Sequence, residues 1–255
     1  MANDFTSLGI YLNSSKEMID FLIEASKYSE KIDCEYGFFD KWASKTGAEL
    51  WTHFTKDGNF RGFSLFYNGE SNFPVRITEK IEKETYTNFE TLLYAWVNPD
   101  EDDPDSGDYP FAFDCVNFPI VGKMEFPCIK NIKLSAFARE LTVYLSEDDY
   151  YSKQIGEQRF ASKSFVPSGA LPPDLDTSKQ YEIFPEAIFT GIILDYKKHE
   201  NELSGKEFYW IKTKTFGEIV IDVVADINLV KNELNINGVI SGGFYLSGKI
   251  EIPLD

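Results

Sequence analysis

The sequence contains no apolar run of about 18 residues, and its first residues carry neither a basic stretch nor a long apolar stretch. We therefore expect no membrane-spanning helix, no secretory signal and a cytoplasmic protein. Cysteine is also scarce, because the chain holds only Cys34, Cys115 and Cys128, with no C-x-x-C pair. An odd number of widely spaced cysteines favours reduced, packed thiols over a disulfide framework.

Positive charge is in short supply. The chain has 42 acidic residues against 25 Lys and Arg, which gives a net charge of -17. Residues 1–122 contain 22 acids and 10 bases, a net -12, and residues 123–255 contain 20 and 15, a net -5. Such a surface repels the phosphate backbone, so nucleic acid is excluded as an expected ligand. The same charge suits either solubility alone or attraction of a basic protein partner.

The apolar content is sufficient for a folded core. Hydrophobic residues make up 43% and aromatic residues 16% of the 255 residues, which excludes global disorder. A chain of this length forms either one large β domain or two ordinary domains. We predict two: an acidic α+β domain at residues 1–122 and a β-rich domain at residues 123–255.

The first unit combines a helix with several strands. Residues 7–12 read as a strand, and Ser14 to Glu17 have the spacing of a capping box, which predicts a helix over residues 15–28. Three further strand-like runs follow, the last two separated by the turn signal at Asp57-Gly58. The predicted order is βαβββ.

This order over residues 7–68 resembles one module of the vicinal-oxygen-chelate superfamily, in which paired βαβββ units curl around a metal site. The resemblance implies His and Glu ligands from the strands, and the chain offers His53 with Glu35 and Glu49 as companions. A lone strand histidine is otherwise a packed or surface residue, because acid–base or metal chemistry needs partners that converge on it.

The second half is dominated by β-branched and aromatic runs between residues 186 and 226, separated by turn signals. Upstream, a strand followed by a short helix from Ser146 is predicted. Glycines interrupt the final apolar strand over residues 238–250, which indicates a bulge or a bend. We expect a small OB-like β-barrel. Residues 125–252 also resemble an uncharacterised bacterial protein family, which implies a cytosolic bacterial protein but no activity.

Residues 98–109 form a strongly acidic stretch, with six acids and two prolines in twelve residues, and are predicted to be a solvated loop. The spacing of Asp103, Gly107 and Asp114 superficially matches a calcium loop, but the turn glycine and the final Glu are out of register. The acids that we predict to contact a partner are Asp100, Glu101, Asp102, Asp103, Asp105 and Asp108.

The fold class predicted from the sequence is α+β, mostly β, with a βαβββ unit followed by the OB-like barrel. No catalytic motif is recognisable, so we expect a non-catalytic binding module that uses its acidic surface to hold a basic protein, without cofactor or metal. One alternative is a small-molecule or metal-dependent enzyme centred on His53. Another is a structural assembly protein, since the sequence leaves the oligomeric state open.

Overall fold

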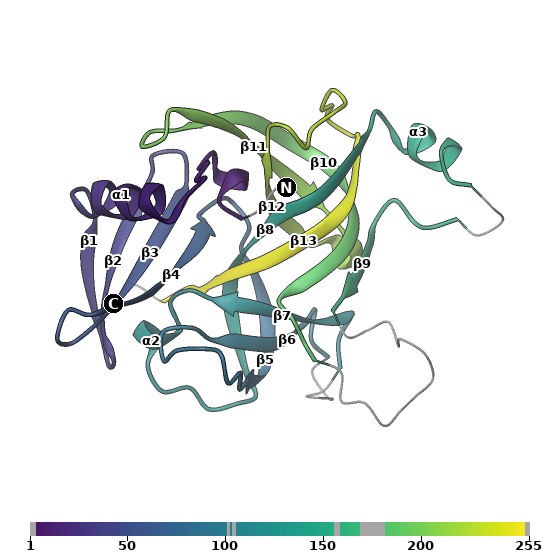
Figure 1. The fold of residues 1–255 in the computed structure, drawn as a ribbon. Coiled ribbons are helices and arrows are strands. Elements are labelled where there is room, and N and C mark those ends of the chain that lie inside the picture. The colour runs from purple at the N-terminus through teal and green to yellow at the C-terminus, as the bar shows by residue number, and fades with distance from the viewer. Residues whose placement is uncertain (1–3, 101–102, 104–105, 156–158, 169–181, 253–255) are drawn as a thin grey trace.

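The structure is a computed structural model that describes residues 4–100, 103, 106–155, 159–168 and 182–252, and it is mostly β, as the sequence predicts. Its strands form two sheets (Figure 1). The smaller sheet has four antiparallel strands in the order β1-β2-β3-β4. These strands are β1 (Glu30–Cys34), β2 (Gly37–Ala43), β3 (Ala48–Thr55) and β4 (Phe60–Tyr67). Because neighbours in sequence are neighbours in the sheet, it is built from local hairpins.

Helix α1 (Ser15–Ser26) begins at the predicted capping box and lies over one face of the smaller sheet (Figure 1). Ser14 Oγ accepts the backbone N–H of Glu17 at 3.2 Å, and the Glu17 carboxylate accepts the N–H of Asn13 at 2.8 Å. These bonds satisfy donors that the start of a helix leaves free. Ala25 packs into the core beneath the helix.

The strand predicted at residues 7–12 is wrong. The chain instead makes a short 3-10 helix, η1 (Thr6–Leu8), which ends at Gly9 with φ of 73°. Side chains replace the missing strand partners: Asn201 Nδ2 donates to the Leu8 carbonyl at 3.0 Å, and Ser204 Oγ donates to the Gly9 carbonyl at 2.6 Å. The N-terminal unit is therefore a helix followed by four strands, not βαβββ.

The larger sheet has nine strands in the order β11-β12-β8-β5-β6-β7-β13-β10-β9. It is mixed, because β12 runs parallel to β8 and β13 runs parallel to β7, whereas the other pairs are antiparallel. The strands are β5 (Phe73–Ile81), β6 (Leu92–Val97), β7 (Tyr109–Cys115), β8 (Cys128–Tyr144), β9 (Ser164–Pro167), β10 (Glu186–Asn201), β11 (Lys206–Lys214), β12 (Val220–Asp226) and β13 (Val239–Ile250). Short helices in the connections are α2 (Phe118–Val121), α3 (Glu147–Ser152) and η2 (Phe216–Glu218).

Two additional pairings, β8 with β13 and β10 with β11, make the larger sheet ring-like but not a barrel. The small OB-like barrel predicted for residues 123–255 is therefore wrong. The reason is that β5 and β7, which precede residue 122, pair with β8 and β13 and join the same sheet. The predicted boundary between residues 122 and 123 lies in the connection from β7 to β8, and the division into two domains stays a prediction.

One local prediction in the second half is confirmed. The strand β8 is followed by helix α3, whose N-cap Ser146 accepts the N–H of Asp149 at 3.1 Å. The bulge expected at the glycines of the final strand lies instead in its neighbour: Gly243 pairs with Glu140 and Phe244 with Ala138, so Arg139 of β8 is the extra residue. A helix cap depends on a few neighbouring residues, whereas a bulge depends on how two strands pair.

The buried hydrophobic side chains form three clusters, each of which packs against one or both sheets. The largest cluster of buried side chains lies within the larger sheet, and a second cluster joins α1 and the smaller sheet to β8, β11 and β12. A third, aromatic cluster covers the other face of the smaller sheet around Phe39, Trp51 and Phe89. Among the helices described, none is long and apolar enough to cross a membrane.

Candidate functional site

The acidic loop predicted from the sequence connects β6 to β7. Asp100, Asp103 and Asp108 are exposed there, whereas Glu101, Asp102 and Asp105 lie outside the described residues. Arg76 Nη1 on β5 donates to the Asp103 carbonyl at 2.7 Å, which attaches the loop to the larger sheet. Asn98 Nδ2 donates to Asp108 Oδ2 at 2.7 Å, which links the two ends of the loop. The exposed carboxylates are therefore presented from an anchored segment.

The calcium-like spacing in this stretch does not bring its residues together, because Asp114 lies at the far end of β7 from the loop. Within the described part of the chain, no three His, Cys, Asp or Glu side chains gather where they could hold a metal ion.

His53, the residue on which the enzyme alternative depends, is fully buried in β3. Its ring stacks on Phe89 at 5.4 Å and meets Phe39 edge-on at 5.3 Å, between ring centroids. Nε2 lies 3.2 Å from Ser64 Oγ, and Nδ1 has no hydrogen-bond partner among the described residues. Burial lowers the pKa of His53 to about 4, so the imidazole is neutral at pH 7.

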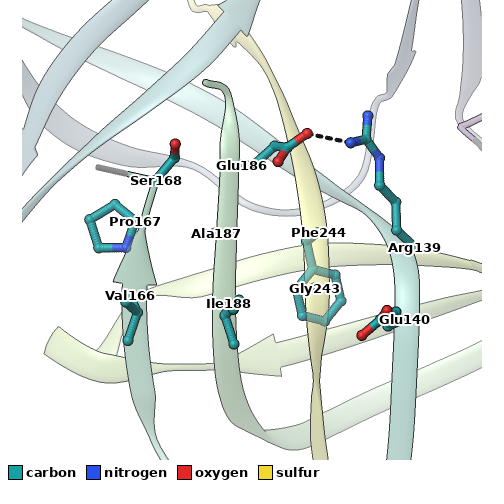
Figure 2. A pocket seen from close by; sticks show the side chains of 10 residues that line it. All are labelled: Arg139, Glu140, Val166, Pro167, Ser168, Glu186, Ala187, Ile188, Gly243 and Phe244. Carbon is teal, nitrogen blue, oxygen red and sulfur yellow. Dashed lines mark hydrogen bonds and ion pairs between the residues drawn. The ribbon is translucent and has the colours of Figure 1, made fainter. Parts of the chain in front are cut away.

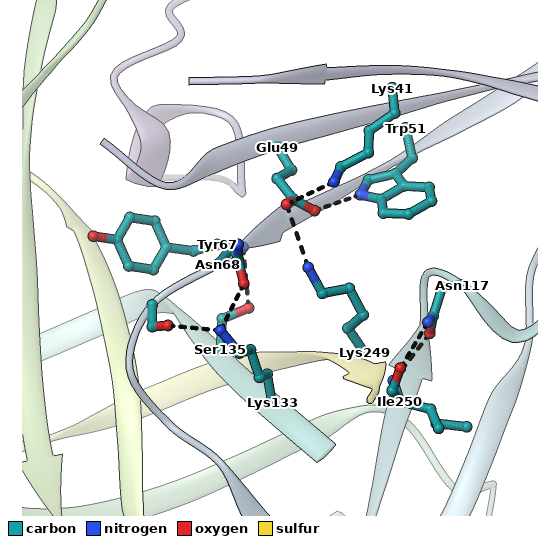
Figure 3. Close-up of polar contacts among 11 residues, drawn as sticks. Lys41, Glu49, Trp51, Tyr67, Asn68, Asn117, Lys133, Ser135, Lys249 and Ile250 are labelled. Atoms are coloured by element: carbon teal, nitrogen blue, oxygen red, sulfur yellow. Dashed lines mark hydrogen bonds and ion pairs between the residues drawn. The ribbon is translucent and has the colours of Figure 1, made fainter. Parts of the chain in front are cut away.

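Glu49 and Glu35, the proposed companions of His53, do not converge on it. Glu35 is exposed in the turn between β1 and β2. Glu49 is 2% exposed, and its Oε1 lies 3.0 Å from Lys41 Nζ and 3.3 Å from Lys249 Nζ (Figure 3). Its Oε2 accepts the indole N–H of Trp51 at 2.9 Å. Glu49 is thus engaged by two lysines and an indole, so its carboxylate already has partners other than His53.

A second buried carboxylate, Asp114, is hydrogen-bonded by two tyrosines, and the sequence analysis did not predict this cluster. Asp114 Oδ1 accepts the hydroxyl of Tyr86 at 2.7 Å, and Oδ2 accepts the hydroxyl of Tyr245. Burial raises the pKa of Asp114 to about 6, partly offset by these two hydrogen bonds. The tyrosines lie 28 and 131 residues away in sequence, so no local spacing could reveal the cluster.

A shallow pocket of about 340 Å³ lies on the face of the larger sheet that is formed by β8, β9, β10 and β13 (Figure 2). Arg139 pairs with Glu186 at its rim, and Gly243 leaves its floor open because nothing lies within 4 Å of where a Cβ would stand. Ile188 projects from the same face and is exposed. This face offers apolar side chains, the Arg139–Glu186 ion pair and the carboxylate of Glu140.

Comparison of the chain with models of protein families, with curated proteins and with solved structures finds no match. The similarities to the vicinal-oxygen-chelate module and to the bacterial family remain predictions from the sequence.

Proposed function

We propose that this protein is a non-catalytic binding module that holds a basic protein partner through the acidic surface centred on the β6–β7 loop. One observation carries the proposal: residues 84–122, which include β6, β7 and their connecting loop, contain nine acids and no Lys, Arg or His. These acids are Glu84, Glu90, Asp100, Glu101, Asp102, Asp103, Asp105, Asp108 and Asp114.

The physical basis is long-range attraction. A continuous stretch of one charge sign produces a local field that accelerates encounter with an oppositely charged protein. The exposed Asp100, Asp103 and Asp108 contribute to that field. Because Arg76 attaches the loop to the sheet and the Asn98–Asp108 bond links the two ends of the loop, less conformational entropy is lost on binding than from a free segment.

The enzyme alternative of the vicinal-oxygen-chelate type receives less support. His53 is buried among aromatic rings, Glu49 is bound by lysines, and Glu35 is exposed in the turn between β1 and β2. The proposal also keeps the cytosolic, bacterial setting expected from the sequence, which suits the three free cysteine thiols.

The test is affinity capture from a lysate of the source organism, followed by mass spectrometry and binding kinetics with the identified protein. The loop variant is Asp100→Asn, Asp103→Asn and Asp108→Asn together. The matched control makes the same charge change at exposed acids elsewhere, with Asp20→Asn, Glu200→Gln and Glu233→Gln. We expect a basic partner, an association rate lowered about tenfold or more only in the loop variant, and a weaker salt dependence.

Capture of no basic protein, or equal losses of association rate in the loop variant and the control, would show that the charge serves solubility alone.

A further inference from the structure

A cavity of about 210 Å³ lies where the edge strand β4 of the smaller sheet meets the larger sheet. Its walls come from the segment before η1, from β4, from the segment before β6, and from β7 and β13. The lining residues on which the argument depends are Asp4, Phe5, Phe63, Glu90, Asp114 and Tyr245. The Asp4 side chain is 29% exposed, so solvent reaches the cavity.

The cavity is negatively charged. Three of its ten lining residues are acids, Asp4, Glu90 and Asp114, and none of the ten is Lys, Arg or His. The hydroxyls that bind Asp114 stabilise a carboxylate without cancelling its charge. Arg139 Nε lies 3.5 Å from Asp4 Oδ1, but this guanidinium also pairs with Glu186, so it does not neutralise the three acids.

The cavity also has aromatic walls. Phe5 and Phe63 meet edge-to-face with centroids 5.1 Å apart. The Tyr245 ring already attracts one cation, because the Arg139 guanidinium carbon lies 5.2 Å from its centroid. Carboxylates beside aromatic rings suit an organic cation, whose charge meets the acids while its carbon chain covers the rings. A hard metal ion instead prefers six or more oxygen ligands.

We propose that this cavity binds the cationic head of an alkylamine or an alkylguanidine, with the charge toward Glu90 and Asp114 and the carbon chain against Phe5 and Phe63. Its volume of about 210 Å³ is smaller than a typical drug-sized pocket, so it accommodates one head group and a short chain. The ligand is either a free small molecule or a Lys or Arg side chain of another protein. The inference does not depend on the β6–β7 loop or on the function proposed above.

Binding has a defined pH dependence. The charged and titratable groups that face Asp114 are Tyr86 and Glu90 from the segment before β6, Tyr245 from β13, and Asp4, which is itself bound by Arg139. Because Asp114 with a pKa of about 6 becomes mostly protonated at pH 5, cation affinity falls roughly tenfold between pH 7 and pH 5.

In the experiment, n-butylamine or n-butylguanidine is added to the full chain, and binding is measured by calorimetry and by amide NMR. N-butylacetamide is the neutral isostere. A blocked Gly-Lys-Gly peptide, with and without acetylation of the lysine, distinguishes the two sources. We expect the cationic probes to bind with shifts confined to the cavity, and the neutral isostere and the acetylated peptide not to bind. Binding of the free amines alone identifies a small-molecule site, and binding of the lysine peptide as well identifies a side-chain site.

Asp114→Asn should weaken butylamine binding at least tenfold, whereas Glu233→Gln, an equal charge change at an exposed position outside the cavity and outside the acidic surface, should leave it unchanged. If Asp114→Asn does not fold, Glu90→Gln provides the same test from the neighbouring segment before β6. Absence of binding by either cationic probe, equal binding of the neutral isostere, or equal weakening by Glu233→Gln would overturn the proposal.

Discussion

Lys249 Nζ on β13 lies 3.3 Å from Oε1 of Glu49 on β3, so an ion pair joins the larger sheet to the smaller one across 200 residues of sequence. Lys41 approaches the same oxygen at 3.0 Å from β2. One carboxylate therefore serves two ammonium groups in a buried position. Burial lowers the pKa of Lys249, and the charge of Glu49 opposes that effect.

Removing the Glu49 charge should destabilise the protein strongly. Glu49→Gln keeps the shape but leaves Lys41 and Lys249 without a counter-charge, and breaking a buried pair in this way costs roughly 3 kcal/mol of unfolding free energy. Urea denaturation measures the change. Glu24→Gln, which breaks an exposed pair with Lys27 on α1, is the control and should leave the midpoint unchanged. Similar midpoints for both variants would show that the Glu49 pairs do not hold the sheets together.

Asp114 should make the protein less stable as pH rises. Its folded pKa of about 6 exceeds the unfolded value of about 4, so the folded state binds the proton more tightly between these pH values. The unfolding free energy from this group therefore falls by up to about 3 kcal/mol between pH 4 and pH 7. Asp114→Asn removes this loss, and its stability relative to wild type should increase with pH. A pH-independent difference between the two proteins would contradict the assignment.

His53 should have the opposite effect. Its folded pKa of about 4 is below the unfolded value of about 6.5, so its neutral form stabilises the fold above pH 6.5, and that stability is lost as pH falls toward 4. The direct measurement is the imidazole NMR signal, which should stay constant from pH 8 to pH 5. The half-buried His199 serves as the internal comparison. Titration of His53 near pH 6.5 would show that its ring is not buried among Phe39 and Phe89.

Two adjacent glycines in β13 should respond differently to alanine. A Cβ at Gly242 would lie 2.0 Å from the carbonyl oxygen of Glu140 on β8, whereas a Cβ at Gly243 meets nothing within 4 Å. Gly242→Ala should therefore lower the unfolding free energy by about 2 kcal/mol or more, because backbone must shift to relieve the clash. Gly243→Ala should be close to neutral. Thermal unfolding of the two variants compares them directly, and equal melting temperatures would disprove the predicted difference.

Local structure was largely predictable from the sequence. The capping box at Ser14, the cap at Ser146 and the turn at Asp57-Gly58 all form as expected, since each depends on a few consecutive residues. The prediction for residues 7–12 was wrong because their sequence pattern is typical of a strand, whereas two of their carbonyls, those of Leu8 and Gly9, accept hydrogen bonds from the side chains of Asn201 and Ser204. A single sequence cannot show such distant partners.

Sheet topology and the carboxylate cluster were not predictable for the same reason. A strand pattern specifies which face is buried but not which strand lies alongside, so β5 and β7 could not be assigned to a sheet with β8 and β13. The position of the acidic loop was predictable from composition. The contact between Asp114 and Tyr245 depends on β7 and β13 being parallel neighbours, and the contact with Tyr86 depends on the path of the segment between β5 and β6.

The central position of β13 has a consequence for how the molecule is made. Its partners β7, β8 and β10 all leave the ribosome before it does, and β8 must wait until β13, about a hundred residues further along the chain, is synthesised before its longest ladder can form. Such late, distant pairing slows folding and leaves strand edges unpaired during synthesis. Nascent chains that stop before Val239 should therefore depend on chaperones, whereas the hairpins of β1 to β4 can assemble while translation continues.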